Sequence, residues 1–139
     1  MTRAELIVAA ARAAIGTPFR HQGRTLGRGL DCAGLAIHCA QTAGIATYDE
    51  TDYPRQPGGG RLEAAFDQQP ELRRIALPEI APGDVLLMTF EGQPQHVAIV
   101  SEVGIIHAYE PIGRVVEHGL TAFWRARIVR AYRFIEVAE

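Results

Sequence analysis

The chain has 139 residues, of which 47% are hydrophobic and 22% are charged, and its formal net charge at pH 7 is −2. This balance is typical of a globular protein with its own core, and we expect residues 1–139 to form a single domain. The nearly neutral charge argues against nucleic-acid binding, and no apolar run reaches the roughly 18 residues of a membrane span.

The N-terminal segment predicts an amphipathic helix. Thr2 and Glu5 match a capping box, and Gly16 and Pro18 are expected to end the helix. Apolar residues recur between them at helical spacing, namely Leu6, Ile7, Ala10, Ala14 and Ile15. Glu5 and Arg12 interrupt the alanine-rich run, which argues against a secretion signal. We therefore expect synthesis in the cytoplasm without a signal peptide.

A loop and a second helix are expected next. Residues 19–30 contain three glycines and no apolar period, which is typical of a loop. Residues 32–43 carry an apolar stripe, and Gly44 is a suitable stop. Cys32 and Cys39 lie on this helix about 10 Å apart, too far for a disulfide.

The second half of the chain predicts mainly strands. An exposed loop is expected at residues 54–60 and a short helix at residues 61–68. Five apolar segments then follow, namely VLLMTF, HVAIV, GIIHAY, GRVVEHGL and ARIVRAYRF. Helices followed by strands predict an α+β fold, in which N-terminal helices pack on a central antiparallel sheet of about five to six strands.

Cys32 is a candidate nucleophile because of its position at a helix start. The N–H groups and dipole of a helix N-terminus favour a thiolate and are suited to hold an oxyanion. Asp31 is a suitable N-cap residue, and Gly34 is expected to leave space beside the sulfur. Cys39 lies deeper among apolar residues, and we interpret it as structural.

Two histidines complete a candidate site. His96 opens one expected strand and His107 lies in the next, with a turn around residues 101–104 between them. A turn of even length lets His96 face His107 or a near neighbour of it, so that His107 can orient His96 as a base for Cys32. A zinc site formed by Cys32, His96 and His107 is an alternative, although the chain lacks a closely spaced ligand pair.

Several segments together resemble the NlpC family of cell-wall cysteine peptidases, in the papain-like superfamily. They are TPFRHQG, GLDCAGL, PGDVLLM, HVAIV and IIHAY, in the order of the family. The resemblance implies a papain-like fold with Cys32 as nucleophile, His96 as general base and His107 as the polar third residue. It also implies an oxyanion hole that uses the Cys32 backbone N–H, and no cofactor or metal.

The resemblance implies the stem peptide of peptidoglycan as substrate, cut between γ-D-Glu and diaminopimelate or Lys. It places Asp31 on the substrate side of the cleft and His21 near the cleft wall. Phe19 stands where family members commonly have Tyr, so a hydroxyl is missing there. A γ-linked D-Glu leaves a free α-carboxylate, for which the loop before Cys32 offers Arg20, Arg24 and Arg28.

TPFRHQG, GLDCAGL and VVEHGL look most like the members found in phage tails and gene transfer particles. This resemblance implies tail-tip proteins as partners and delivery to the cell wall on a phage-like particle. Three alternatives remain open. They are a papain-like amidase, acyltransferase or thioesterase on another substrate, a structural tail subunit with a non-essential site, and a zinc-binding interaction domain.

Overall fold

A computed structural model describes residues 1–45, 47, 49, 53–54, 60–90 and 92–135. The helices in this part of the chain are α1 (Arg3–Ala13), α2 (Cys32–Thr42), α3 (Arg61–Asp67), α4 (Ala122–Arg125) and the 3-10 turn η1 (Leu77–Glu79). The strands are β1 (Arg24–Thr25), β2 (Gly29–Leu30), β3 (Leu72–Ile75), β4 (Val85–Phe90), β5 (Gln93–Val100), β6 (Gly104–Tyr109), β7 (Arg114–Gly119) and β8 (Ile128–Phe134). None of these helices is long and apolar enough to cross a bilayer.

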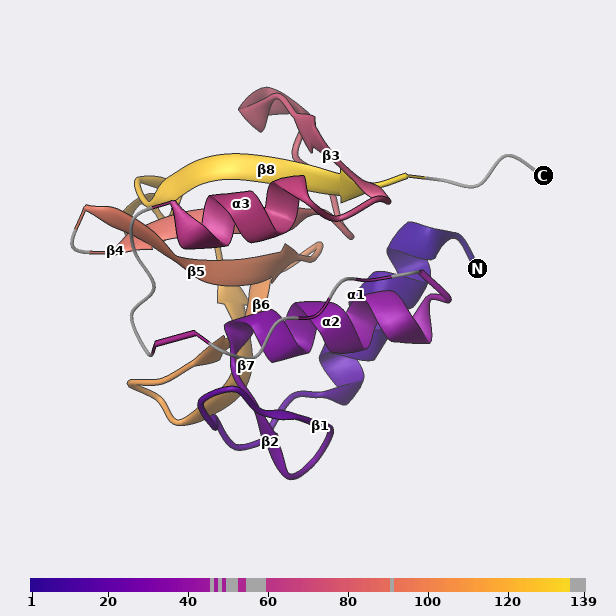
Figure 1. Ribbon diagram of the computed structural model, residues 1–139, viewed down its shortest axis with the longest axis vertical. Helices are drawn as coiled ribbons and strands as arrows, with labels where there is room; N and C mark the ends of the chain where they lie inside the picture. Colours follow the sequence, from indigo (N-terminus) through magenta and orange to yellow (C-terminus); the bar gives the residue numbers. More distant parts are fainter. Residues whose placement is uncertain (46, 48, 50–52, 55–59, 91, 136–139) are drawn as a thin grey trace.

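Six strands form one antiparallel sheet in the order β3-β8-β4-β5-β6-β7. The predicted α+β fold with five to six antiparallel strands is thus confirmed. The last strand of the chain, β8, lies inside the sheet between β3 and β4, as Figure 1 shows. The N-terminal half of the chain supplies the longer helices α1, α2 and α3, and the C-terminal half supplies the six-stranded sheet together with the short helix α4.

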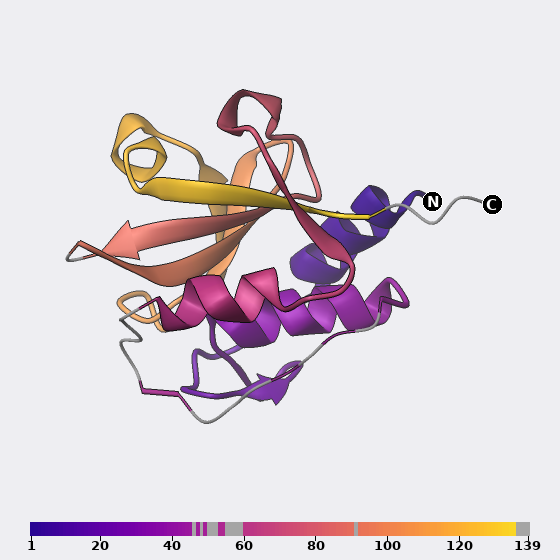
Figure 2. The same ribbon diagram turned by 45° about the horizontal axis from the view of Figure 1, so that its top comes forward.

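Helices α1 and α2 lie side by side and cover one face of the sheet (Figures 1 and 2). The core between these layers includes Ile7, Leu35, Cys39, Val97, Ile99 and Ile106. Alternate residues of the same strands form a second cluster on the opposite face, which includes Met88, Ala98, Val100 and Ile105. Side chains alternate along a strand, so both faces of β5 and β6 are buried.

Helix α1 begins as predicted and ends earlier. The Thr2 hydroxyl accepts a hydrogen bond from the Glu5 N–H at 3.1 Å, and the Glu5 carboxylate accepts one from the Thr2 N–H at 3.0 Å. The helix ends at Ala13, and Gly16 takes a positive φ of 90°. Ile15, which we expected on the apolar stripe, lies beyond the helix and is 46% exposed.

Five short elements were not predicted. The loop expected at 19–30 contains the β1–β2 hairpin, and strand β3, the η1 turn and helix α4 were missed. Each has at most four residues, too few for apolar periodicity to be recognised. Helices α2 and α3 lie within one residue of the predicted ranges. Of the loop expected at 54–60, residues 55–59 lie outside the described part of the chain.

Candidate active site

The start of α2 is held by a side-chain cap. Asp31 is the N-cap residue, and its Oδ1 accepts a hydrogen bond from the Gly34 N–H at 2.7 Å. Cys32 is therefore the first residue of α2, and its side chain is half-buried beside the sheet. The predicted N-cap and helix start are both confirmed.

The Asp31 carboxylate also joins the helix to the preceding loop and to Tyr53. Its Oδ1 accepts from Arg24 Nη1 at 3.0 Å, and its Oδ2 accepts from the Gln22 N–H at 2.9 Å and from the Tyr53 hydroxyl. Burial, and then the hydrogen bond to Asp31, raise the pKa of Tyr53. Tyr53, 22 residues from Asp31 in the sequence, thus adds a hydroxyl to the cleft that Phe19 also lines.

Gly34 has a different role from the one expected. Its N–H already donates to Asp31, so it is not a donor for an oxyanion. A Cβ at Gly34 would lie 2.0 Å from the Gly23 carbonyl oxygen, so the missing side chain makes room for the loop and not for the sulfur. The Leu35 N–H donates to the Asp31 carbonyl at 3.0 Å. The candidate donors to an oxyanion in the first turn are therefore the N–H groups of Cys32 and Ala33.

The environment of the Cys32 thiol opposes ionisation. Burial and, after it, the negative charge of Asp31 raise the pKa of Cys32 to about 12, although the N–H groups of Val97 and Ala33 act in the opposite direction. The sequence-based expectation of a lowered thiol pKa is therefore wrong. A helix N-terminus does stabilise a thiolate, but desolvation and the neighbouring carboxylate outweigh it. The thiol is protonated at rest and needs a base.

The two histidines predicted to meet are in contact. His96 Nε2 lies 2.6 Å from His107 Nδ1. Strands β5 and β6 pair through Ile99–Ile106 and Val100–Ile105, so the turn between them has four residues, an even length. His107 is fully buried and His96 is 7% exposed. Burial lowers the pKa of both imidazoles, which are neutral at pH 7.

Cys32, at the start of α2, lies next to the backbone of β5. The Cys32 sulfur lies beside the N–H of Val97, the residue that follows His96 on β5. His96 Nε2 contacts His107 Nδ1, so His96 Nδ1 is the ring nitrogen that takes no part in this contact. The structure thus places Cys32 beside the residue that follows His96, and the site side chains that it shows in direct contact are His96 and His107.

Two further side chains surround the histidines and were not predicted. His118 on β7 contacts His107, with 2.8 Å between their Nε2 atoms. The indole of Trp124 on α4 packs against the rings of His107 and His118, with centroid distances of 5.0 and 5.2 Å. The equal spacing of 11 residues from His96 to His107 and from His107 to His118 was a signal in the sequence.

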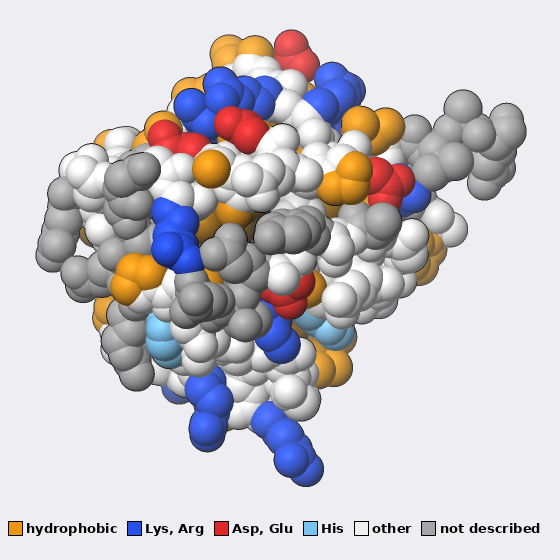
Figure 3. Space-filling view, viewed as in Figure 1, with side chains coloured by type: hydrophobic (Ala, Val, Ile, Leu, Met, Phe, Trp, Pro, Cys, Tyr) orange, Lys and Arg blue, Asp and Glu red, His pale blue; other side chains and the backbone are white. Residues whose placement is uncertain are grey.

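A cleft of about 120 Å³ opens in front of Cys32 between α2, α3 and the sheet. One end is polar and includes Asp31, Arg24, Asp49, Tyr53, Arg61 and His21. The rest is mainly apolar, and apolar side chains are visible beside a basic one on this face (Figure 3). Phe19 lines the cleft, and the His21 ring lies edge-on to Tyr53 at 5.5 Å. Cys32 is the residue of the site that faces this space.

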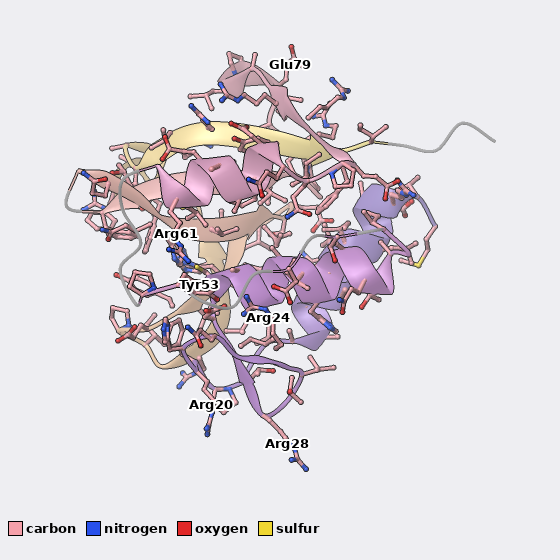
Figure 4. All side chains as sticks on the ribbon, viewed as in Figure 1. Arg20, Arg24, Arg28, Tyr53, Arg61 and Glu79 are labelled. Carbon is pink, nitrogen blue, oxygen red and sulfur yellow. The ribbon has the colours of Figure 1, made fainter. Side chains whose placement is uncertain are left out.

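The three arginines of the preceding loop have different positions. Arg24 reaches the cleft, where it is paired with Asp31 and Asp49 at 3.0 Å each. Arg20 and Arg28 are exposed and project outward, away from Arg24 and Tyr53 (Figure 4). Arg61, at the start of α3, lines the cleft and was not predicted. Within the described residues, no group of three or more His, Cys, Asp or Glu side chains is arranged to hold a metal ion.

Comparisons with known proteins agree with this fold. The model of the NlpC/P60 family matches residues 16–133. A crystal structure of the NlpC/p60 domain of the peptidoglycan hydrolase SagA is 27% identical with a TM-score of 0.64, covering 92% of this chain and 96% of that one. No curated protein sequence matches the chain significantly.

Two longer proteins share the fold. A Staphylococcus aureus protein described as similar to a lipoprotein of the NLP/P60 family is 26% identical with a TM-score of 0.66, covering 97% of this chain and 42% of that one. The peptidoglycan hydrolase RipB from Mycobacterium tuberculosis is 19% identical with a TM-score of 0.67, covering 98% and 66%. This chain thus spans less than half of the staphylococcal protein.

Proposed function

This chain belongs to the NlpC/P60 family, and from that premise we propose that it is a cysteine peptidase that hydrolyses peptidoglycan stem peptides. Cys32 acts as nucleophile, His96 as general base and His107 as the group that orients His96. The observation that carries the proposal is the 2.6 Å contact between His96 and His107 at the point where β5 meets the start of α2. The SagA domain, which is described as part of a peptidoglycan hydrolase, supports the substrate class.

In this mechanism the thiol is activated at the moment of attack. The pKa of about 12 keeps Cys32 protonated at rest, so His96 Nδ1 takes the thiol proton as the sulfur attacks the amide carbonyl. The N–H of Cys32 holds the oxyanion, because that of Gly34 is occupied. His96 then protonates the leaving amine, and water hydrolyses the thioester.

The bond cleaved is, on this proposal, that between γ-D-Glu and diaminopimelate or Lys. The free α-carboxylate of γ-D-Glu requires a cationic group, and the polar end of the cleft carries Arg24 and Arg61. Arg24 is already paired with the carboxylates of Asp31 and Asp49 and bonded to the Tyr53 hydroxyl. On this proposal it therefore binds the substrate as part of this group of side chains.

An amidase or acyltransferase on another substrate is the second candidate. The observation that favours it is the apolar wall of the cleft between α2 and α3, which includes Ala36, Ile37, Leu62 and Phe66. Such a wall suits an acyl chain better than a stem peptide.

The experiment that tests the first proposal is digestion of L-Ala-γ-D-Glu-meso-diaminopimelate-D-Ala, with products identified by mass spectrometry. We expect L-Ala-γ-D-Glu from the wild type and from Cys39→Ala, and no product from Cys32→Ala. Cys39 is the matched control because it lies on the same helix and is buried in the core. If another bond is cleaved and this cleavage requires Cys32, the mechanism is kept and the assigned substrate bond is wrong. If neither this peptide nor sacculi are cleaved, the proposal is contradicted.

Delivery of the protein on a phage-like particle, with tail-tip proteins as partners, is proposed on the resemblance of three segments alone. The test is mass spectrometry of particles purified from a producing strain, in which this chain should be present at a fixed ratio to tail proteins. If Cys32→Ala particles assemble but do not enter cells, the site is essential. If they infect normally, the chain is a structural tail subunit.

A further inference from the structure

Three histidines form one continuous hydrogen-bonded chain across three strands. His96 Nε2 lies 2.6 Å from His107 Nδ1, and His107 Nε2 lies 2.8 Å from His118 Nε2. His118 Nδ1 lies 3.0 Å from the Gly119 carbonyl oxygen. The mechanism described above uses only the first two histidines, so the third needs an explanation.

The Gly119 carbonyl gives this chain a direction. A carbonyl oxygen only accepts, so His118 Nδ1 carries a proton, and in neutral His118 the Nε2 atom must accept. His107 therefore carries its proton on Nε2 and accepts at Nδ1. By the same argument His96 carries its proton on Nε2, and its Nδ1 lone pair is left for the thiol.

The chain also runs from a buried end to a more accessible one. His107 and His96 are buried, whereas His118 is half-buried on the edge strand β7. His118 is therefore the member of the chain that lies closest to solvent. Among the described residues, the His118 ring contacts His107 from β6, Trp124 from α4 and the Gly119 carbonyl.

The nearest charged side chain along β7 is directed elsewhere. Glu117 precedes His118 in the strand, and its carboxylate pairs with Arg12 of α1 at 2.9 Å. Neighbouring strand residues point to opposite faces, so this ion pair does not face the imidazole. The state of His118 is therefore coupled chiefly to the other two histidines.

We propose that His118 is a positioning residue that, anchored on the Gly119 carbonyl, fixes the tautomers of His107 and His96 and receives the positive charge when Cys32 is activated. The thiol proton moves to His96 Nδ1, the Nε2 proton of His96 moves to His107 Nδ1, and the Nε2 proton of His107 moves to His118 Nε2. Cys32 is then a thiolate and His118 an imidazolium. Reversal of the three steps returns a proton through His96 Nδ1 to the leaving amine.

One consequence distinguishes this role from a merely structural one. Without an acceptor at His118 Nε2, nothing fixes the proton of His107 on Nε2, and the tautomers of both His107 and His96 are free to reverse. In the reversed tautomer His96 carries a proton on Nδ1 and is no longer a base for Cys32.

The first test reads the tautomers directly and needs no substrate. Long-range ¹H–¹⁵N spectra of the labelled protein at pH 7.5 should show Nδ1–H for His118 and Nε2–H for His107 and His96. In His118→Leu, the latter two should become mixtures of tautomers. An Nδ1–H tautomer for His96 in the wild type, or unchanged tautomers in His118→Leu, would overturn the proposal.

The second test measures alkylation of Cys32 by iodoacetamide. We expect His118→Leu to lower the rate at pH 7.5 by roughly 10- to 100-fold. His118→Gln should recover most of this loss, because Gln Oε1 accepts from His107 Nε2. His38→Gln, on α2 outside the cleft, is the matched control and should react as the wild type does.

The inference concerns the site on which the proposed function rests, but the two can fail separately. If the tautomers and alkylation rates are as expected and the muropeptide is not cleaved, the substrate is wrong and His118 keeps its role. If the muropeptide is cleaved and His118→Leu reacts with iodoacetamide at the wild-type rate, the role of His118 is refuted.

Discussion

The substitution Asp31→Asn removes the negative charge at the start of α2 and keeps the shape of the side chain. Asp31 is 3% exposed, and its two oxygens accept four hydrogen bonds. The donors on Oδ1 are Gly34 and Arg24, and those on Oδ2 are Gln22 and Tyr53. Asn has one oxygen and cannot accept all four.

The expected loss of stability follows from these contacts. Asn caps a helix as well as Asp does, so the hydrogen bond to Gly34 persists. The amide nitrogen replaces Oδ2 and leaves the part-buried Gln22 N–H without an acceptor, at about 1–3 kcal/mol, and Arg24 loses the charge of its partner. We expect the free energy of unfolding to fall by about 2–4 kcal/mol in total.

The same substitution should make the Cys32 thiol more reactive, although it makes the protein less stable. The Asp31 charge is, after burial, the second cause of the raised pKa of Cys32. Asp31→Asn should therefore lower this pKa, so that iodoacetamide alkylates Cys32 faster at a fixed pH. Urea unfolding measures the stability, and the pH dependence of alkylation, followed by mass spectrometry, measures the pKa.

The matched control is Asp49→Asn, which removes the other carboxylate bound to Arg24. Asp49 is 29% exposed, so we expect a loss below about 1 kcal/mol. The reasoning is refuted if Asp31→Asn is as stable as Asp49→Asn, or if its alkylation midpoint moves to higher pH.

Three further substitutions or conditions test the fold. Because burial lowers the pKa of His96 and His107 below the value near 6.5 in the unfolded chain, the unfolded state binds more protons, and stability should fall as pH decreases from 7 to 5, by up to about 2 kcal/mol per histidine at pH 5. Urea unfolding at pH 7 and pH 5 should show that the free energy of unfolding depends less on pH in His107→Gln than in the wild type. An equal dependence on pH in both proteins would contradict this prediction. Gly34→Ala should lower the free energy of unfolding by about 2–4 kcal/mol, because the added Cβ would lie 2.0 Å from the Gly23 carbonyl oxygen. A melting temperature equal to that of the wild type would contradict this prediction. Asp84→Ala should lower the free energy of unfolding by about 2–4 kcal/mol, because the buried Asp84 carboxylate accepts two hydrogen bonds of 2.9 Å from Arg133 and one of 2.8 Å from the Ala81 N–H. A loss below about 1 kcal/mol in chemical denaturation would contradict this prediction.

The sequence by itself determined the features that depend on short-range pattern. The capping box of Thr2 and Glu5 and the N-cap Asp31 act within one helical turn, so their positions could be predicted. The contact between His96 and His107 depends on strand alternation and on a four-residue turn, and both are local as well. The order of helices and strands in the chain was sufficient for the fold class.

Only the tertiary structure decided the features that depend on contacts between distant segments. The raised pKa of Cys32 results from burial by the sheet, whereas the local effect of the helix start has the opposite sign. Tyr53 reaches Asp31 from 22 residues away. The place of β8 inside the sheet is likewise set by pairing across the chain and not by its own pattern. His118 joins the histidine chain because β7 pairs with β6 in one register, and a shift of one residue would turn its ring to the other face.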